Sequence, residues 1–200
     1  MVAFPHAITL TGGIATGKST AASLLKLFGF RIIDADAIAH QILDQEAGAI
    51  ATLFGPRYVV DGKVDRKALG RLVFADQEQR QRLEALLHPK IKERILELAA
   101  REEGFKVPYF VDIPLFFERG DYPFAKSVVV YAPKELQITR LMERNGLDYQ
   151  EALQRIEAQM DIEKKRVLAD YVVDNTKDLK HLQRQIEELA ERIKNDFGIG

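Results

Sequence analysis

The sequence predicts an α/β fold with three layers, in which helices cover both faces of a parallel sheet. Two observations support this prediction. Five short segments rich in β-branched and aromatic residues alternate with long helical patterns. These segments are nearly continuous apolar runs, which is typical of strands buried on both faces. The predicted strands are residues 7–10, 30–33, 109–111, 127–131 and 171–173.

Composition predicts one soluble folding unit with a sizeable core. The chain has 200 residues, of which 46% are hydrophobic. Its formal net charge of -1 lacks the basic excess of a nucleic-acid binder. The absence of cysteine excludes disulfides and thiol catalysis, and it fits a reducing cytoplasm. The start shows no secretory signal, and the longest apolar run, residues 107–117, is too short to cross a bilayer. We therefore expect a cytoplasmic protein without a membrane partner.

The stretch between the second and third predicted strands is far longer than a crossover connection requires. Its pattern is almost wholly helical. Gly55-Pro56, Asp61-Gly62 and His88-Pro89 are expected to divide it into several helices. The longest is predicted over about residues 76–103, with a break at Pro89. We predict that this stretch forms a helical substrate-holding lobe.

Two further helical patterns surround the last predicted strand. Before it, Arg140 and Arg144 lie one helical turn apart and share a face, and Asn145-Gly146 is expected to end their helix. After it, residues 178–196 repeat apolar residues at helical spacing. This closing helix is predicted to pack on the sheet.

A glycine-rich segment follows the first predicted strand and opens a helix. Residues 12–19 match the pattern G-x-x-x-x-G-K-[ST]. Such a loop turns its backbone N–H groups toward phosphates, and the helix N-terminus adds positive potential. Lys18 is expected to reach the β- and γ-phosphates of ATP, and the Ser19 hydroxyl to ligate Mg²⁺. The predicted nucleotide-binding residues of the loop are Gly13, Ile14, Ala15, Thr16, Gly17, Lys18, Ser19 and Thr20.

Two carboxylates follow the second predicted strand, at the edge where ligands collect in open α/β sheets. Asp36 is the candidate base that accepts the proton of an attacking hydroxyl group. Asp34 is the candidate that orients hydrated Mg²⁺. Either side chain could instead cap the next helix, and the two functions are compatible.

Four more candidate residues lie after later strands. Asp112 resembles the acidic residue that contacts the Mg²⁺ shell in P-loop enzymes, although it could simply cap a strand end. Arg140 and Arg144 could stabilise charge on the transferring phosphoryl group, or form a solvated face paired with nearby acids. Asn175 follows the last strand, where a P-loop kinase often receives adenine.

These motifs, in this order, resemble those of the dephospho-CoA kinase family over nearly the whole chain. The departures are mild: Ala15-Thr16 stands where the family usually has Gly-Ser, and Phe116 replaces Leu. The matching segments are TGGIATGKS at 11–19, DADAIAH at 34–40, LEALLHP at 83–89, DIPLFFE at 112–118, RLMER at 140–144, AQM at 158–160 and ADYVVDN at 169–175.

The resemblance implies a P-loop core with a five-stranded parallel sheet, a helical CoA-binding lobe and a helical lid. It also implies phosphorylation of the ribose 3′-hydroxyl of dephospho-CoA by ATP with Mg²⁺, the final step of coenzyme A biosynthesis. The expected regions are 1–36, 105–133 and 168–200 for the core, 37–104 for the lobe and 134–167 for the lid.

The substrate contacts are expected from four residues. Thr11, beside the loop, would help to seat the acceptor, together with Asp36, His88 and Leu115. A lone histidine without a positioned partner indicates no catalytic role for His88. A small-molecule partner, no nucleic acid and a monomer or weak homo-oligomer are expected.

Two other functions remain open at this point. The first is another small-metabolite kinase, such as a nucleoside monophosphate or shikimate kinase. The second is a nucleotide-dependent switch without an acceptor, which the carboxylate pair does not fit. Residues 175–178 hold the letters of the guanine-reading signature in the wrong order, which argues against a GTPase.

Overall fold

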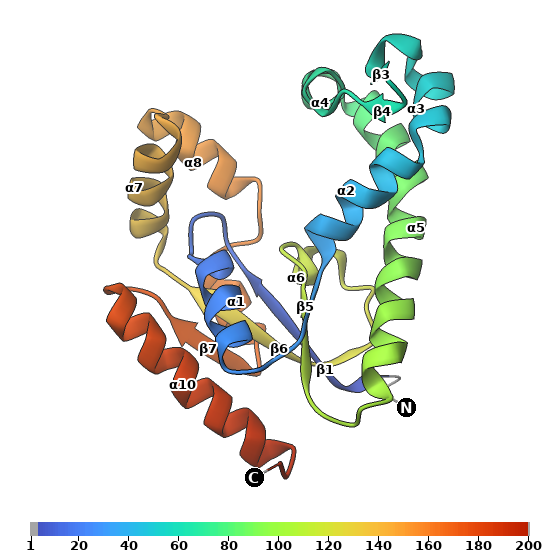
Figure 1. Cartoon of the computed structure of the whole chain (residues 1–200). Helices are drawn as coiled ribbons and strands as arrows, with labels where there is room; N and C mark the ends of the chain where they lie inside the picture. Colours follow the sequence, from blue (N-terminus) through green and yellow to red (C-terminus); the bar gives the residue numbers. More distant parts are fainter. Residues whose placement is uncertain (1–3, 200) are drawn as a thin grey trace. The chain divides into compact units, whose positions relative to one another are not determined.

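The computed structural model describes residues 4–199, and its main feature is one five-stranded parallel sheet (Figure 1). The spatial order of the strands is β2, β5, β1, β6 and β7. The fold class predicted from the sequence is therefore confirmed. The strands are β1 (Phe4–Gly12), β2 (Ile32–Asp34), β5 (Tyr109–Asp112), β6 (Phe124–Tyr131) and β7 (Tyr171–Asp174).

Strand β1 is central and pairs in parallel with both β5 and β6. Because parallel strands end at the same edge, the residues that follow β1 lie in the middle of the carboxyl edge of the sheet. Leu10 of β1 pairs with Asp112 of β5, and Gly12 pairs with Val130 of β6. The sheet thus gathers segments that are far apart in the sequence.

Both faces of the sheet are covered, which explains the continuous apolar runs. Side chains alternate between the faces of a strand. Val128 and Val130 of β6 pack in a cluster with helices α1 (Lys18–Leu27) and α10 (Leu179–Asp196). Val129 and Tyr131 pack on the other face with Ile162 of α9 (Ile162–Leu168). Helices α6 (Phe116–Arg119), α7 (Lys134–Asn145) and α8 (Tyr149–Glu157) belong to the same part of the chain as the sheet.

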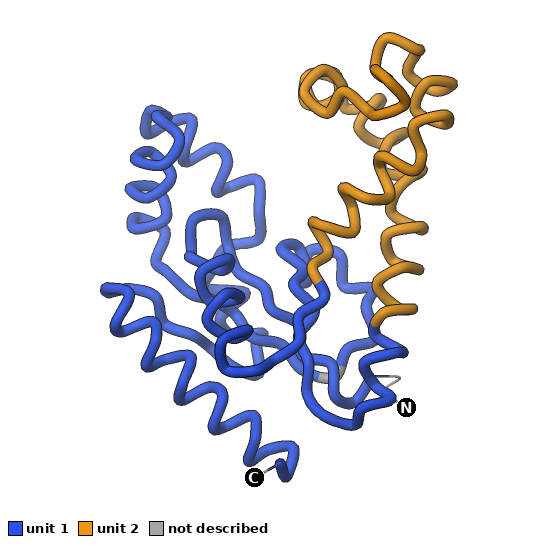
Figure 2. Tube along the Cα trace, viewed as in Figure 1, with its two compact units in different colours: residues 1–33, 99–200 blue, residues 34–98 orange. Residues whose placement is uncertain are grey.

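Residues 34–98 form a compact unit of their own, and the described parts of 1–33 and 99–200 form the other (Figure 2). The smaller unit has a separate core around Ile50, Tyr58 and Leu69. Its helical elements are α2 (Ala35–Gln45), α3 (Ala47–Phe54), a 3₁₀ turn (Pro56–Tyr58), α4 (Arg66–Ala75) and most of α5 (Gln77–Glu103).

A short hairpin interrupts the helices of the smaller unit, where an almost wholly helical stretch was predicted. Strands β3 (Val59–Val60) and β4 (Lys63–Val64) pair in antiparallel fashion. Asp61 and Gly62 connect them with φ angles of 49° and 74°. An Asp-Gly pair with positive φ at both residues is typical of a tight hairpin turn. The stretch is thus mostly helical, as predicted, but the prediction did not include this hairpin.

The predicted break at Pro89 is also wrong, because α5 continues through it from Gln77 to Glu103. Proline lacks an N–H group, so the helix gives up the hydrogen bond to the Ala85 carbonyl. Buried apolar side chains at four-residue spacing continue past the proline and hold both parts in one helix. They are Leu87, Ile91, Ile95 and Ala99.

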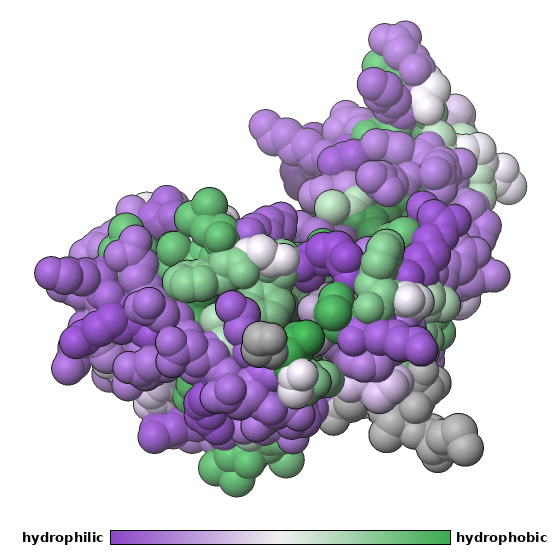
Figure 3. Space-filling model, turned by 60° about the horizontal axis from the view of Figure 1, so that its bottom comes forward, coloured by the Kyte–Doolittle hydropathy of each residue, from purple (hydrophilic) through white to green (hydrophobic). Residues whose placement is uncertain are grey.

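Two predicted helix boundaries are confirmed. Helix α7 ends at Asn145, and Gly146 follows it with a φ of 65°. Helix α10 begins after Asp178, whose carboxylate accepts a hydrogen bond from the His181 amide. The visible surface is largely hydrophilic with separate apolar patches (Figure 3). Within residues 4–199, every helix is too short or too polar to span a membrane.

Candidate active site

The glycine-rich loop curls between the end of β1 and the start of α1. Ala15 and Gly17 have φ angles of 61° and 92°, both in the left-handed region. The Thr16 side chain is fully buried, and its Oγ1 donates a hydrogen bond to the Gly13 carbonyl at 2.9 Å. As far as the described residues show, no side chain caps the α1 N-terminus at Gly17. The first amides of α1 can therefore bind an anionic ligand.

Lys18 and Asp112 form a close ion pair beside this loop. Lys18 begins α1, and Asp112 ends β5, the strand next to β1. Their side chains are only 15% and 10% exposed. The structure thus brings together the lysine predicted to bind phosphate and the carboxylate predicted to contact the Mg²⁺ shell.

Asn175 braces the loop from the end of β7. Its Nδ2 donates to the Thr16 carbonyl at 2.8 Å, and its backbone N–H donates to the Tyr131 carbonyl at 2.8 Å. A Cβ atom at Gly17 would overlap with Asn175 Nδ2, so any larger residue there would displace the Asn175 side chain. The sequence placed Asn175 near the nucleotide but did not indicate this contact with the loop backbone.

The two predicted arginines of α7 have different surroundings. Arg140 Nη2 donates to the Asn175 carbonyl at 2.9 Å, so Arg140 joins the contacts around the loop. Arg140 Nη1 is buried, and among the described residues it has no hydrogen-bond partner. Arg144 is exposed, and its Nε donates to Asn145 Oδ1 at 2.9 Å. The structure brings Arg140 to the loop region and leaves Arg144 on the surface.

Thr11 and Leu115, two predicted substrate contacts, lie at the same edge of the sheet. Thr11 is fully buried, and its Oγ1 donates to the Pro114 carbonyl at 2.9 Å. Leu115 is partly buried and directly precedes α6. Their contact with a substrate stays a prediction.

The remaining predicted residues belong to the unit formed by residues 34–98. Asp34 Oδ1 accepts a hydrogen bond from the Ala37 amide at 2.9 Å, so Asp34 caps α2. Asp36 lies in the first turn of α2, and its side chain is exposed. His88 lies inside α5 and is partly buried. The metal, base and substrate roles of these residues stay predictions.

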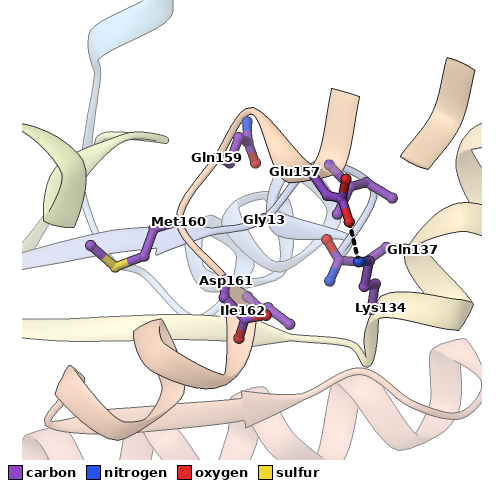
Figure 4. Close-up of a pocket in the computed structure, with 9 residues that line it drawn as sticks. Gly13, Lys134, Gln137, Glu157, Gln159, Met160, Asp161 and Ile162 are labelled. Carbon is purple, nitrogen blue, oxygen red and sulfur yellow. Dashed lines mark hydrogen bonds and ion pairs between the residues drawn. The ribbon is translucent and has the colours of Figure 1, made fainter. Parts of the chain in front are cut away.

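One contact between the loop and the segment after α8 was not expected from the sequence. Gln159 Oε1 accepts a hydrogen bond from the Ile14 amide at 2.8 Å. A cavity of about 170 Å³ lies beside this contact (Figure 4). The matching segment AQM at 158–160 contains Gln159, but no role was predicted for this residue. The cavity is lined by Gly13, Lys134, Gln137, Ile156, Glu157, Gln159, Met160, Asp161 and Ile162.

The oxygen donors near the loop fit Mg²⁺ bound together with a nucleotide. Across residues 4–199, no three His, Asp or Glu side chains gather in a metal-binding group. Mg²⁺ usually takes one or two protein carboxylates and completes its shell with water and phosphate oxygens. The Ser19 hydroxyl in the first turn of α1 and the Asp112 carboxylate have the required chemistry.

These features define the class of the protein. A central parallel strand leads into a curled glycine-rich loop and a helix, and the loop lysine pairs with a carboxylate of the neighbouring strand. This is the arrangement of a P-loop nucleotide-binding enzyme.

The chain belongs to the dephospho-CoA kinase family, because the family model described as Dephospho-CoA kinase matches residues 6–181. The Dephospho-CoA kinase of Sulfurimonas denitrificans is 53% identical over 98% of both chains. That of Wolinella succinogenes is 47% identical over 100% of both. A solved dephospho-CoA kinase from Campylobacter jejuni superimposes with a TM-score of 0.78 at 36% identity, covering 96% of this chain and 98% of that one. The resemblance seen in the motifs is therefore confirmed.

Proposed function

We propose that this chain transfers the terminal phosphoryl group of ATP to the ribose 3′-hydroxyl of dephospho-CoA, which gives CoA and ADP in the final step of coenzyme A biosynthesis. The observation that carries this function is family membership over residues 6–181. The curled loop with its buried Lys18–Asp112 pair supports it, since phosphoryl transfer depends mainly on positioning and electrostatic stabilisation.

The loop residues 13–20 hold the phosphates of ATP through their backbone N–H groups. Lys18 exchanges Asp112 for the β- and γ-phosphates when the nucleotide binds. Ser19, Asp34 and Asp112 are the proposed residues around Mg²⁺. The metal, when bound with ATP, neutralises charge on the phosphate oxygens.

Asp36 orients the acceptor hydroxyl and accepts its proton. Arg140 and Arg144 stabilise the charge that develops on the transferring group. Asn175 contacts the nucleotide while it braces the loop, and Thr11, His88 and Leu115 contact dephospho-CoA. We propose residues 37–104 as the CoA-binding lobe and 134–167 as a lid. We also propose a cytoplasmic monomer or weak homo-oligomer that binds no nucleic acid.

An acceptor screen tests this function. ADP release is measured with ATP and Mg²⁺ against dephospho-CoA, nucleoside monophosphates, shikimate and gluconate. We expect strong acceptor-dependent release only with dephospho-CoA, with the new phosphate on the ribose 3′ position by mass spectrometry and NMR. Transfer to another acceptor would favour a different small-metabolite kinase. Slow hydrolysis that no acceptor stimulates would favour a nucleotide-dependent switch.

A further inference from the structure

A fully buried lysine lies behind the phosphate loop. Lys165 of α9 is 0% exposed, whereas its neighbour Lys164 on the same helix is exposed. Lys165 Nζ lies 2.8 Å from Glu118 Oε1, 3.0 Å from the Gly12 carbonyl oxygen and 3.4 Å from the Pro114 carbonyl oxygen. An ammonium group has three donors and no acceptor, so each N–H group has one oxygen.

Glu118 extends these contacts to a third segment. It lies in α6, and its Oε1 also accepts a hydrogen bond from the Met160 amide at 3.0 Å. Met160 follows Gln159, whose side chain holds the Ile14 amide of the loop. The ion pair therefore connects the start of the loop, the turn after β5 and the segment that joins α8 to α9.

The position of the Gly12 carbonyl affects the conformation of the whole start of the loop. Gly12 ends β1 and begins the glycine-rich pattern. Because the peptide bond is planar, fixing this carbonyl also fixes the direction of the Gly13 N–H group. The Pro114 carbonyl lies two residues after Asp112, the partner of Lys18. One ammonium group thus contacts both strand ends that supply the phosphate site.

A charge buried this deeply is unfavourable unless it is paired and hydrogen-bonded. If the side chain only filled space, an apolar residue would do so without the cost of burying a charge. We propose that Lys165 and Glu118 form a positioning pair that holds the start of the phosphate loop in its ATP-binding conformation and links it to the segment around Met160. The proposal deepens the proposed function, on which it rests for the identity of the nucleotide.

The main variant is Lys165→Met, which keeps an unbranched side chain but removes all three donors. We expect the Kd for ATP, measured by isothermal titration calorimetry without an acceptor, to rise about 10- to 100-fold. The Kd for dephospho-CoA alone should stay within about twofold. Lys164→Met is the matched control on the same helix, and both of its Kd values should stay within about twofold of the wild type.

Hydrogen exchange of the nucleotide-free protein tests the structural link directly. In Lys165→Met, peptides that cover residues 12–16 and 158–161 should exchange faster than in the wild type. Faster exchange confined to α9 would overturn the proposal. So would unchanged ATP affinity, or a lowered Tm with equal weakening of both ligands, because that pattern indicates only a packing role.

If Lys165→Met does not fold, the variant Glu118→Gln tests the proposal instead. It keeps an acceptor for the Met160 amide but removes the charge that faces Lys165. We expect the Kd for ATP to rise about fivefold with dephospho-CoA binding unchanged. Unchanged ATP binding in folded Glu118→Gln would overturn the proposal. Failure of the proposed function would be seen separately, as wild-type protein that binds ATP but does not phosphorylate dephospho-CoA.

Discussion

Ala15 adopts a backbone conformation in the phosphate loop that glycine would adopt more easily. Its φ is 61°, and the left-handed conformation costs a non-glycine residue roughly 1–2 kcal/mol. The family usually has glycine at this position, so the departure was visible in the sequence. Only the structure shows which backbone angle makes it unfavourable.

Replacing Ala15 by Gly should therefore stabilise the protein. The relief of strain exceeds the added entropy of the unfolded chain, and we expect a gain of about 0.5–1 kcal/mol in the free energy of unfolding, measured with urea. Ala100→Gly, at an exposed site inside α5, is the matched control and should lose about 0.5–1 kcal/mol. A similar loss in both variants would contradict the prediction.

Gly17→Ala and Gly29→Ala separate backbone strain from a steric clash. Both glycines have positive φ, 92° and 87°, but a Cβ atom would meet Asn175 at Gly17 and open space at Gly29. Gly29→Ala should cost roughly 1–2 kcal/mol of stability and leave ATP binding unchanged. Gly17→Ala should cost more and also weaken ATP binding in a calorimetric titration, because the Asn175 brace must move. Equal effects of the two variants would show that the Asn175 contact is unimportant.

Asp36→Asn tests the proposed base. The amide keeps the shape of the side chain but cannot accept the proton, so kcat should fall about 10²- to 10⁴-fold with the KM for ATP little changed. Asp44→Asn, on the same helix, loses only an ion pair with Arg66 and is the control. Near-normal turnover in Asp36→Asn would remove Asp36 from the mechanism.

At the residue scale, the sequence predicted candidates better than it predicted contacts. Lys18 and Asp112 were both expected at the phosphate site, because one lies in a known pattern and the other ends a strand. The hydrogen bonds of Thr11 with Pro114 and of Asn175 with Thr16 join residues more than a hundred positions apart. Such contacts depend on the order of strands in the sheet, which spacing alone does not give.

At the scale of elements, the strands of the sheet were predictable because burial on both faces leaves an apolar run. The hairpin at Asp61-Gly62 was missed, although the Asp-Gly pair between short β-branched segments is a known hairpin signal. The continuation of α5 through Pro89 was missed because tertiary packing on both sides of the proline outweighs one lost hydrogen bond.

The carboxylate of Asp196, in the last turn of α10, forms hydrogen bonds with side chains of the sheet. Asp196 accepts hydrogen bonds from the Tyr171 hydroxyl and, at 3.3 Å, from Lys126 Nζ. These two bonds, Tyr171 first, lower the pKa of Asp196 from its ordinary value of 3.8. A lowered pKa stabilises the folded state above the ordinary value, and this contribution is lost as the pH falls through the folded value.

Asp196→Asn should therefore change the acid sensitivity of the protein. At pH 7 we expect a fall in Tm of roughly 1 °C, because the site is exposed. Below about pH 3.8 the carboxylate is protonated first in the unfolded chain and, at lower pH, in the folded state, so the difference in Tm should shrink. Calorimetry at both pH values measures this. A difference that stays constant from pH 7 to pH 3 would contradict the assignment.

At the largest scale, each of the two units has at least one apolar core of its own among the described residues. Ile50 is fully buried in the core of residues 34–98, and Ile186 is fully buried in the core of the other unit. Both of these clusters consist of side chains from their own unit. Local stability can therefore differ between the two units.

Ile50→Ala and Ile186→Ala test this independence. Each should cost about 2–5 kcal/mol in the unit that holds it, because a cavity is left in a packed core. In hydrogen exchange, Ile50→Ala should lower protection within residues 34–98 and leave the sheet strands nearly unchanged. Ile186→Ala should do the reverse. Loss of protection throughout the chain in both variants would mean that the protein unfolds as a single cooperative unit.

The central place of β1 in the sheet has a consequence for synthesis. Strand β1 and its glycine-rich loop are synthesised before the segments that hold them, because the neighbours of β1 are residues 109–112 and 124–131, and the side chain that holds the loop is Asn175. Strand β1 can therefore pair with both of its neighbours only after residue 131 has been synthesised. The hydrogen bond from Asn175 to the loop forms only after residue 175 has been synthesised, so the complete phosphate site assembles late in translation.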